Sequence, residues 1–314
     1  MNSSSQNIIS YINLNYFQGS GLKHLQKKDL KKHKVNFPQT PKEQSKIVEI
    51  LSKIDNAISE TENIITKYNR IKSGLMQDLL TKGIDNKGVI RSEETHNFIN
   101  SSNFNYPKDW QLTTIENCLI SIEQGWSPNC EGDPASLNDW GILKTSSVTW
   151  GGYDENQNKK MPEILTPKTK YKVKEGDVLI TRAGPNSRVG VVAFVNKTRD
   201  KLIFSDKIYR LIPKENVHNR YLALALSSEF TQRHLSNYKT GMAESQTNIS
   251  QKIVLALKIL LPSIEEQKRI IETLNSTENV IDSLLLNLSK LEGIKTGLMQ
   301  DLLSGNKRVT HLLN

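Results

Sequence analysis

Two stretches of the chain repeat the same spacing of apolar residues. In each, apolar or near-apolar side chains recur at alternating steps of four and three residues, the spacing typical of helices that pair with one another. The positions are Ile47, Leu51, Ile54, Ile58, Thr61, Ile65 and Tyr68 in the first stretch, and Ile270, Leu274, Thr277, Ile281, Leu284, Leu288 and Leu291 in the second. The pattern predicts two long helices with narrow apolar stripes.

The two stretches are copies of one sequence. Aligning residues 43–80 with residues 266–303 gives 17 identities in 38 positions, and both copies end in GLMQDLL. Such a repeat indicates one structural unit used twice. Because the first helix leads into the intervening segment and the second leads out of it, we expect an antiparallel coiled coil. The alternative is two separate helices packed on other surfaces.

Both copies start with a helix-entry signal. Thr40 stands three residues before Glu43, and Ser263 stands three residues before Glu266. This is the spacing of a capping box, in which the hydroxyl and the carboxylate each satisfy a free backbone N–H at the helix start. The signals predict that both helices begin close to these residues.

Each copy also keeps a glycine in its last two turns, Gly74 in the first and Gly297 in the second. Glycine inside a helix costs about 1 kcal/mol relative to alanine. Since both copies accept this cost, we expect a close approach of backbones at these positions.

The segment between the helices changes in character along its length. Residues 82–105 are polar with scattered glycine and asparagine, which is typical of a linker. Within residues 106–262, the runs GDVLITRA, RVGVVAFVN and KLIFSDKIYRLIP predict strands, and YLALALSSEFTQRHL predicts a helix over residues 220–237. The predicted fold class is α+β, with one globular mixed α/β domain flanked by two long helices that pair as an antiparallel coiled coil.

The N-terminal segment echoes the end of that domain. Residues 25–38 (LQKKDLKKHKVNFP) align with residues 249–262 (ISQKIVLALKILLP), so the segment has the sequence of the closing piece of another domain. The predicted order is a domain remnant (1–38), the first long helix (39–81), a linker (82–105), the globular domain (106–262), the second long helix (263–304) and a tail (305–314).

The formal net charge of +9 is unevenly distributed. Residues 1–40 carry six Lys and one Asp, and residues 106–263 carry 21 basic and 16 acidic side chains, so each segment sums to +5. This excess fits a polyanionic partner such as DNA or RNA, the alternative being a solvated basic surface.

Targeting and redox signals are sparse. The apolar runs are too short or too broken to span a bilayer, and the first residues lack the pattern of a secretory signal. Cys118 and Cys130 have neither metal-type nor disulfide-type spacing. We expect a cytoplasmic protein with inert thiols and no membrane partner.

Catalytic motifs are missing from the sequence. There is no G-x-x-x-x-G-K-[ST] phosphate loop, no glycine-rich cofactor loop after a strand, no Asn-Pro-Pro-aromatic methylase motif and no H-E-x-x-H cluster. We therefore expect no catalytic residues, no cofactor and no bound metal.

Several short segments mark the boundaries of the predicted elements. They are PKDW and QLTTI at the domain entry, QGWSP, KEGDVLITRAG, SQTNIS near the domain end, LPSIEEQKRIIETL opening the second helix, and GLMQDLL closing each helix. Their order and wording, over residues 25–304, resemble the specificity subunit of type I restriction-modification enzymes. In that family two target-recognition domains alternate with two helical regions that pair as an antiparallel coiled coil. Only one recognition domain is complete here, so the chain resembles a half-length specificity subunit.

The resemblance implies a non-catalytic subunit that binds double-stranded DNA. It also implies that the helices bind methyltransferase subunits and, through them, restriction subunits. The second half of a two-part DNA target would come from self-association or from a complementing half-subunit. The residues expected to pair the helices are Ile47, Leu51, Ile54, Ile58, Ile65, Ile270, Leu274, Ile281, Leu284, Leu288 and Leu291.

Candidate DNA-binding residues lie on predicted loops and carry side chains that can reach phosphates or base edges. An arginine paired with guanine, or an asparagine paired with adenine, is the expected readout. The structural alternatives are that Trp126 anchors a loop and that Asn186 serves turn geometry. The candidates are Gln124, Trp126, Ser127, Lys144, Thr145, Ser146, Ser147, Arg182, Asn186, Ser187, Arg188, Lys239, Thr240, Ser245, Gln246 and Asn248.

Two other function classes remain open. A non-enzymatic coiled-coil scaffold, such as a chromosome-organising protein, fits the helices, although they are short and no ATPase head accompanies them. A nuclease would need a metal site of clustered Asp, Glu and Lys residues within 106–262, which the sequence does not show. A metal-dependent cleavage assay on the isolated chain tests the nuclease alternative.

Overall fold

The structure is a computed structural model that describes residues 38, 40–100, 104–130, 132–239 and 246–313. It divides into two compact units, one formed by residues 73–275 and a helical unit formed by residues up to 72 together with residues 276–314. Helices α3 (Pro41–Thr81) and α8 (Ile264–Leu303) are continuous and contribute to both units. Within the described ranges, no helix is long and apolar enough to cross a membrane.

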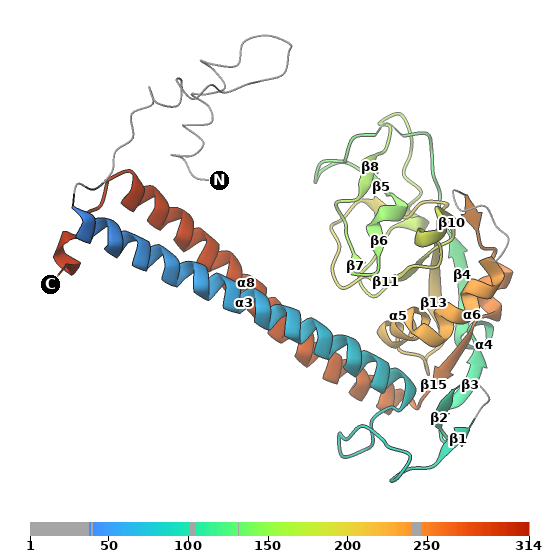
Figure 1. Cartoon of the computed structure of the whole chain (residues 1–314). Coiled ribbons are helices and arrows are strands. Elements are labelled where there is room, and N and C mark those ends of the chain that lie inside the picture. Colours follow the sequence, from blue (N-terminus) through green and yellow to red (C-terminus); the bar gives the residue numbers. More distant parts are fainter. Residues whose placement is uncertain (1–37, 39, 101–103, 131, 240–245, 314) are drawn as a thin grey trace. The chain divides into compact units, whose positions relative to one another are not determined.

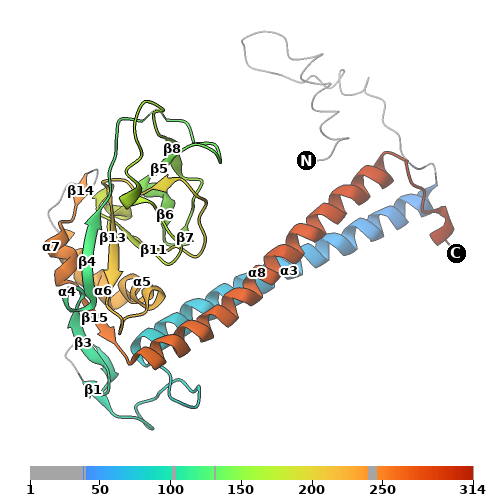
Figure 2. The same cartoon turned by 180° about the vertical axis from the view of Figure 1, so that it is seen from behind.

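In the helical unit, α3 and α8 lie side by side and run in opposite directions (Figures 1 and 2). Lys295 Nζ lies 2.6 Å from Asp55 Oδ1, and Lys72 Nζ lies 2.7 Å from Glu278 Oε1. Early residues of α3 therefore face late residues of α8. The helices are 41 and 40 residues long, close to the length predicted from the repeat.

Each of the predicted helix-pairing residues is buried or half-buried. Ile47, Ile270, Leu274 and Ile281 are buried. The others are half-buried, namely Leu51, Ile54, Ile58, Ile65, Leu284, Leu288 and Leu291. The four-three spacing thus predicts which side of each helix turns away from solvent.

Both helix starts differ from the predicted capping box in one respect. The hydroxyl half forms as expected, with Thr40 Oγ1 accepting from the Glu43 amide at 3.4 Å and Ser263 Oγ from the Glu266 amide at 3.3 Å. The carboxylates, however, accept hydrogen bonds from arginines that follow the end of the other helix. The prediction for the carboxylates was wrong because an arginine fork satisfies a buried carboxylate with two charge-assisted bonds.

The Glu266 clasp lies in the 73–275 unit and consists of Glu266, Arg91, Trp110 and the Ile84 amide. Arg91 Nη1 donates to Glu266 Oε1 at 2.5 Å, and Arg91 Nη2 donates to Oε2 at 3.0 Å. Trp110 Nε1 donates to Oε2 at 3.1 Å, and the Ile84 amide donates to Oε1 at 2.9 Å. All four residues are buried.

The Glu43 clasp lies in the helical unit and consists of Glu43, Arg308 and the Val309 amide. Arg308 Nε and Nη2 donate to Glu43 Oε1 and Oε2, both at 2.7 Å, and the Val309 amide donates to Oε1 at 3.4 Å. Ile47 and Leu302 form a small apolar cluster with Val309. The hydrogen bond from Arg308 holds the pKa of the Glu43 carboxyl below its ordinary value.

The two glycines of the repeat do not mark a close approach within the chain. A Cβ built at Gly74 or at Gly297 meets no heavy atom within 4 Å. The prediction of a close backbone contact was wrong. The side of each helix that is turned away from solvent, which we call the seam, is formed by the predicted helix-pairing residues, and both glycines lie in open space.

The globular domain is built around an antiparallel sheet in the order β11-β9-β13-β4. Its strands are β4 (Leu119–Gln124), β9 (Val178–Thr181), β11 (Val192–Phe194) and β13 (Ile208–Pro213). The sheet is covered on both faces, since Val178 and Ile180 belong to one apolar cluster and Leu179 to another. Strand β9 is therefore buried throughout, as its uninterrupted apolar run predicts.

Smaller sheets surround the central one. A three-stranded sheet has the order β12-β5-β8, with β12 (Leu202–Ile203) parallel to β5 (Gly141–Leu143) and β8 (Asn158–Lys160) antiparallel to it. The two-stranded pairs are β1 (Phe98–Asn100) with β2 (Asn105–Pro107), β3 (Gln111–Thr114) with β15 (Lys258–Leu261), β6 (Val148–Thr149) with β7 (Gly152–Tyr153), and β10 (Ala183–Gly184) with β14 (Thr247–Asn248).

The helix predicted over residues 220–237 is two helices, α5 (Asn219–Ser227) and α6 (Glu229–Lys239). Ser228 between them has an extended backbone, and its Oγ accepts from the Thr231 amide at 3.3 Å. The prediction of one helix was wrong because this serine caps a new helix. Two short helices, α4 (Ile115–Cys118) and α7 (Gln251–Ala256), complete the domain.

Residues 82–105 have the composition of a linker, but some of them enter the core. Ile84 and Arg91 are buried, and Ile84 forms a β-bridge with Ile90. Nearby, Cys118 is a free, buried cysteine, and burial raises the pKa of its thiol to about 11. That thiol stays protonated at neutral pH, so it is a poor nucleophile.

Candidate nucleic-acid interface

Loops at one end of the central sheet bring together three of the predicted DNA-binding stretches. Strand β4 ends at Gln124, β9 ends at Thr181, and β13 begins at Ile208 at this same end, because both strands run antiparallel to β13. The polar residues that follow β4 and β9 therefore lie beside each other. We call this end of the sheet the loop face.

Arg182 is at the centre of the loop face. Its Nη1 donates to the Asp206 carbonyl oxygen at 3.2 Å, and its Nη2 donates to Asn248 Oδ1 at 2.9 Å. The guanidinium carbon lies 5.3 Å from the centre of the Tyr209 ring. These contacts fix the direction of a long side chain that is only half-buried.

The backbone holds Arg182 and Asn248 together as well. Strand β10 pairs antiparallel with β14, so Ala183 lies opposite Asn248 and Gly184 lies opposite Thr247. The Ile249 amide donates to the Arg182 carbonyl oxygen at 2.9 Å. Two residues of base-reading type, 66 positions apart in sequence, are thus placed side by side.

The turn after Arg182 is rigidly supported. Residues Asn186–Arg188 form a 3-10 turn, and Lys239 Nζ donates to the carbonyl oxygens of Asn186 at 3.3 Å and Val189 at 3.0 Å. Burial lowers the pKa of Lys239, which fits an amine engaged with the protein. Ser187 and Arg188 are exposed at the tip.

The segment after β4 joins the same face. Gln124 is exposed, and Ser127 Oγ accepts from the Asp206 amide at 3.2 Å. Trp126 is half-buried beside the apolar cluster of Ile142, Met161 and Ile203, and Lys168 Nζ lies 4.5 Å from the centre of its ring. The indole therefore has the environment of a loop anchor.

The fourth predicted stretch, residues 144–147, directly follows strand β5 of the three-stranded sheet. Ser147 is fully buried and donates to the Lys144 carbonyl oxygen at 2.8 Å, and Ser146 donates to Gln157 Oε1 at 2.9 Å. These bonds stabilise the 3-10 turn Thr145–Ser147 after β5. In the described ranges, no hydrogen bond joins this turn to Arg182.

Of the last group of candidates, Gln246 is exposed next to β14, whereas Thr240 and Ser245 lie outside the described residues. Sequence reasoning missed Asp206 and Lys207, which follow β12. Both lie on the loop face, because the Arg182 side chain donates to the Asp206 carbonyl oxygen and the Arg182 amide donates to the Lys207 carbonyl oxygen. The only sequence signal was the short polar interruption SDK inside a predicted strand run.

Arg210 shows that a basic residue of this domain can be wholly structural. It donates to Glu123 Oε2 at 2.6 and 2.9 Å and to Asp177 Oδ2 at 3.2 Å. It also donates to the carbonyl oxygens of Lys170 and Lys172, and only 8% of its side chain is exposed. Arg210 is therefore not a candidate for contact with DNA.

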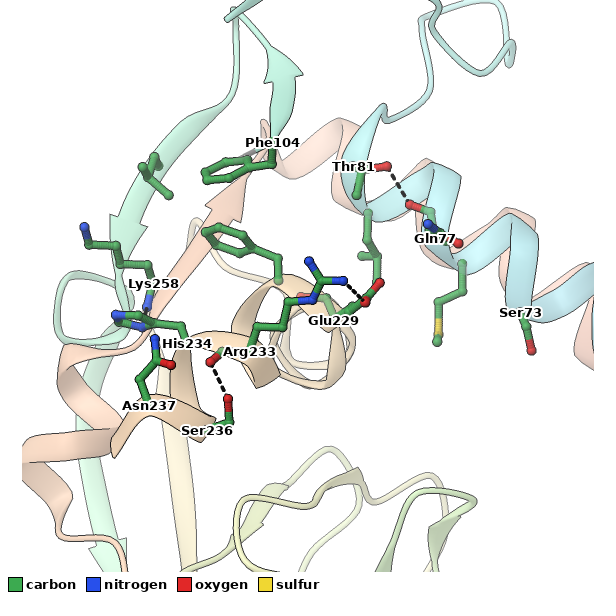
Figure 3. Close-up of a pocket in the computed structure, with 15 residues that line it drawn as sticks. Ser73, Gln77, Thr81, Phe104, Glu229, Arg233, His234, Ser236, Asn237 and Lys258 are labelled. Carbon is green, nitrogen blue, oxygen red and sulfur yellow. Dashed lines mark hydrogen bonds and ion pairs between the residues drawn. The ribbon is translucent and has the colours of Figure 1, made fainter. Parts of the chain in front are cut away.

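A groove lies elsewhere in the 73–275 unit, against the end of α3 (Figure 3). Its wall on α3 includes Met76, Gln77 and Leu80 of the first GLMQDLL, and Phe104 and Phe230 also line the groove. The lining is largely apolar, which distinguishes the groove from the loop face. No cluster of three or more potential metal-ligating His, Cys, Asp or Glu side chains occurs in the part of the chain that the structure describes.

Comparisons with known proteins place this geometry in context. The sequence profile described as "Type I restriction modification DNA specificity domain" matches residues 5–72 and 143–292. The chain is 39% identical over 191 residues to the type I restriction enzyme EcoEI specificity subunit of Escherichia coli, which covers 60% of this chain and 32% of that protein. It is 28% identical over 307 residues to the MjaVIII specificity subunit of Methanocaldococcus jannaschii, covering 94% of this chain and 67% of that protein.

A solved structure shows a similar fold. The crystal structure of a type I restriction-modification system S subunit from M. genitalium matches with a TM-score of 0.55 at 13% identity, over 96% of this chain and 70% of that chain. The chain thus spans about a third of the EcoEI subunit's length and about two thirds of the MjaVIII subunit's. Since the family profile matches more than half of its residues, the chain belongs to the family of type I restriction-modification DNA specificity domains.

Proposed function

We propose that this chain is a sequence-specific DNA-recognition and scaffold subunit of a type I restriction-modification complex, acting in the cytoplasm. Residues 106–262 are its recognition domain and bind one half of a two-part target. Bond making and breaking belong to separate methyltransferase and restriction subunits. Family membership and the specificity-subunit relatives support this assignment.

The observation that carries the proposal is the contact between Arg182 and Asn248 on the loop face. Arginine and asparagine are the residue types that pair with guanine and adenine edges in the major groove. Here each orients the other at 2.9 Å, on backbone that is itself paired between β10 and β14. A preorganised pair loses little conformational entropy on binding. Arg188 and Lys207, both exposed, are suited to phosphate contacts nearby.

We infer that α3 and α8 form an antiparallel coiled coil that separates two DNA-recognition positions. The four-three spacing, the reduced exposure of the seam and the Lys295–Asp55 and Lys72–Glu278 ion pairs support this inference. A helix of 41 residues is about 60 Å long at 1.5 Å per residue. Such a length suits a rigid spacer between two half-sites.

We assign the binding of methyltransferase subunits to the GLMQDLL segments. All seven residues are identical in the two copies, whereas the four-three spacing continues only to the first and second leucines of each, Leu75 and Leu79 in the first copy and Leu298 and Leu302 in the second. Gly74 and Gly297 lie in open space, so the helix backbone is accessible to another protein at both positions. The apolar groove beside the first copy offers a pocket for a side chain of that partner (Figure 3).

The DNA assignment is tested by selecting duplexes from random DNA with the chain and its methyltransferase subunit at about 150 mM salt, where nonspecific binding is weak. We expect enrichment of a defined half-site. Arg182→Ala should weaken binding by about 1–3 kcal/mol and relax the preference at one position, whereas Arg188→Ala should weaken binding to all sequences equally. Lys214→Ala, which removes an exposed positive charge just after the other end of β13, is the matched control. No enriched sequence from an intact complex would remove the recognition role and leave the scaffold role.

The partner assignment is tested by Gly74→Ala and Gly297→Ala. Because no neighbouring heavy atom of the described residues lies within 4 Å of the added methyl group, each change should stabilise the helix by about 0.5–1 kcal/mol. If a partner packs closely against the glycine, the same change should weaken assembly with the methyltransferase subunit. Unchanged assembly of both variants, measured by analytical ultracentrifugation, would assign the docking surface elsewhere.

A further inference from the structure

Asp206 places a carboxyl group on the loop face, among residues that carry positive charge. Arg182 donates to its backbone carbonyl oxygen, Lys207 follows it in the chain and is exposed, and Arg188 is exposed at the tip of the turn after Arg182. A carboxylate repels the phosphate groups of nucleic acid, so its presence here weakens nonspecific binding. The position of Asp206 therefore needs a reason other than attraction to the DNA backbone.

The backbone of Asp206 is held on both sides. Its amide donates to Ser127 Oγ at 3.2 Å, and its carbonyl oxygen accepts from Arg182 Nη1 at 3.2 Å. The Arg182 amide also donates to the Lys207 carbonyl oxygen at 2.9 Å, and residues 205–208 are closed into a turn by an amide-to-carbonyl bond of 3.0 Å. The Asp206 side chain therefore starts from a fixed place on the loop face.

The carboxyl group of Asp206 takes no part in these contacts. An aspartate that serves turn geometry commonly accepts from a backbone amide two residues on, as Asp85 does from the Lys87 amide at 2.8 Å. Arg182, by contrast, donates to the Asp206 carbonyl oxygen, and in the part of the chain that the structure describes the Asp206 carboxylate makes no hydrogen bond or ion pair. It is an acceptor on a half-buried residue that the described fold does not use.

The adjacent guanidinium of Arg182 keeps donors for a ligand as well. Its bonds to Asp206 and Asn248 use one N–H from each terminal nitrogen, and each of these nitrogens carries two. Among the described residues, one N–H on Nη1 and one on Nη2 thus remain, which is the pair that guanine accepts at N7 and O6. Arg182 and Asp206 together present two donors beside an acceptor.

That order of groups matches one kind of base pair. In the major groove a G·C pair presents the acceptors N7 and O6 of guanine and then the N4 amino donor of cytosine. Adenine also carries an amino donor, but its N7 acceptor lies beside it and would face the second carboxylate oxygen. Thymine offers an acceptor and a methyl group, which leave a carboxylate without a donor. Cytosine is therefore the base that fits Asp206.

We propose that Asp206 is a specificity-determining residue, which accepts a hydrogen bond from the N4 amino group of cytosine. Arg182 binds the guanine of the same base pair, and its bond to the Asp206 carbonyl oxygen fixes the two residues relative to each other. The inference rests on the proposed function, since it names a base pair that the loop face reads. Removing the carboxylate then has two opposite effects, because binding to all DNA strengthens as repulsion is lost while discrimination at one base pair falls.

The proposal is tested with Asp206→Ala and Asp206→Asn in the full chain, bound to its methyltransferase subunit. The site that the native complex selects is changed at each position in turn, and dissociation constants are measured at about 150 mM salt for every changed duplex and for a random duplex. With Asp206→Ala we expect the preference for one G·C pair to fall by about fivefold or more, while binding to the random duplex becomes tighter. Arg182→Ala should lose its preference at that same pair.

The second variant separates the acceptor from the charge. Asp206→Asn removes the negative charge as Asp206→Ala does, but it keeps an acceptor oxygen. It should therefore bind the random duplex as tightly as Asp206→Ala and still retain part of the preference for the G·C pair. Glu215→Gln, which removes an exposed negative charge beyond the other end of β13, is the matched control and should leave the preference unchanged.

Other results would overturn the proposal. If both Asp206 variants strengthen binding to every duplex by the same factor, the residue acts through its charge alone. A loss of preference at an A·T pair, or at a pair other than the one that Arg182→Ala relaxes, also contradicts the assignment. A native complex whose selected site is unaffected by Asp206→Ala refutes this inference and leaves the proposed function standing. A native complex that selects no sequence refutes the proposed function and this inference with it.

Discussion

The Glu266 clasp and the Glu43 clasp are the same device in two environments. In both, a glutamate at the third position of a helix meets an arginine that follows the other helix. Around Glu266 the arginine is covered and an indole adds a donor, whereas around Glu43 the arginine remains largely in water. The Glu43 carboxylate is itself buried, but its arginine reaches water, and a partly screened pair contributes less to stability than a fully covered pair, which is costly to break. The contrast teaches that the surroundings, more than the pairing residues, set the contribution of such a contact.

The largest expected effect comes from removing one arginine at a time. Arg91→Ala leaves the buried Glu266 carboxylate with an indole and an amide as its donors among the described residues, so we expect a loss of about 3–5 kcal/mol in the free energy of unfolding. Arg308→Ala should cost much less, because water can reach the vacated position. Urea unfolding of both variants measures the difference, and equal losses would show that cover does not decide the value of the pair.

The apolar equivalents should differ in the same direction. Leu80→Ala removes a buried side chain from the main apolar cluster, which costs about 2–5 kcal/mol. Leu303→Ala removes a partly exposed one and should cost less than about 1 kcal/mol. The comparison is made by urea unfolding under the same conditions. A large loss for Leu303→Ala would mean that another part of the protein covers this leucine in solution.

A single substitution can remove from the Glu266 clasp the indole donor that the Glu43 clasp lacks. Trp110→Phe keeps an aromatic ring but removes the indole N–H, so that among the described residues Arg91 is the remaining donor to Glu266 Oε2. We expect a loss of about 1–3 kcal/mol, the cost of an unmade bond to a buried charged group. Trp150→Phe, at an exposed tryptophan, should change stability by less than about 0.5 kcal/mol and serves as control. If the two variants are equally stable, the indole hydrogen bond contributes nothing.

The smallest effect is a pH dependence at the open clasp. Arg308 holds the pKa of Glu43 below its ordinary value of 4.5. A group whose pKa is lowered by folding stabilises the protein above its unfolded pKa, and this contribution is lost as the pH falls through the folded pKa. The stability difference between the native chain and Arg308→Ala should therefore be constant above pH 4.5 and shrink below it. Urea titrations at neutral and acidic pH measure the trend, and a difference that grows in acid would contradict it.

Local periodicity predicted much of the helical part. The steps of four and three identify the protected side of each helix, and the hydroxyl caps at Thr40 and Ser263 form as the sequence indicates. These features depend on neighbours within one turn of helix. The break at Ser228 is also local, but serine is common both inside helices and at their starts, so the apolar pattern concealed it.

Contacts between distant residues were outside the reach of the pattern. Arg91 and Glu266 are 175 positions apart, and nothing in the spacing of either indicates the other. The loop face shows the same limit, because Arg182 and Asn248 were proposed from separate stretches and the pairing of β10 with β14 brings them together. The residue types could be selected from the sequence, whereas their arrangement depends on the topology of the sheet.

The two clasps also limit how far α3 can slide along α8. A heptad stripe is nearly self-similar, so one helix could shift along the other by seven residues, about 10.5 Å, and still bury apolar side chains. Such a shift would separate both glutamates from both arginines at once. The two clasps therefore fix a single register of α3 against α8. The apolar stripe contributes buried surface but does not need to determine the register.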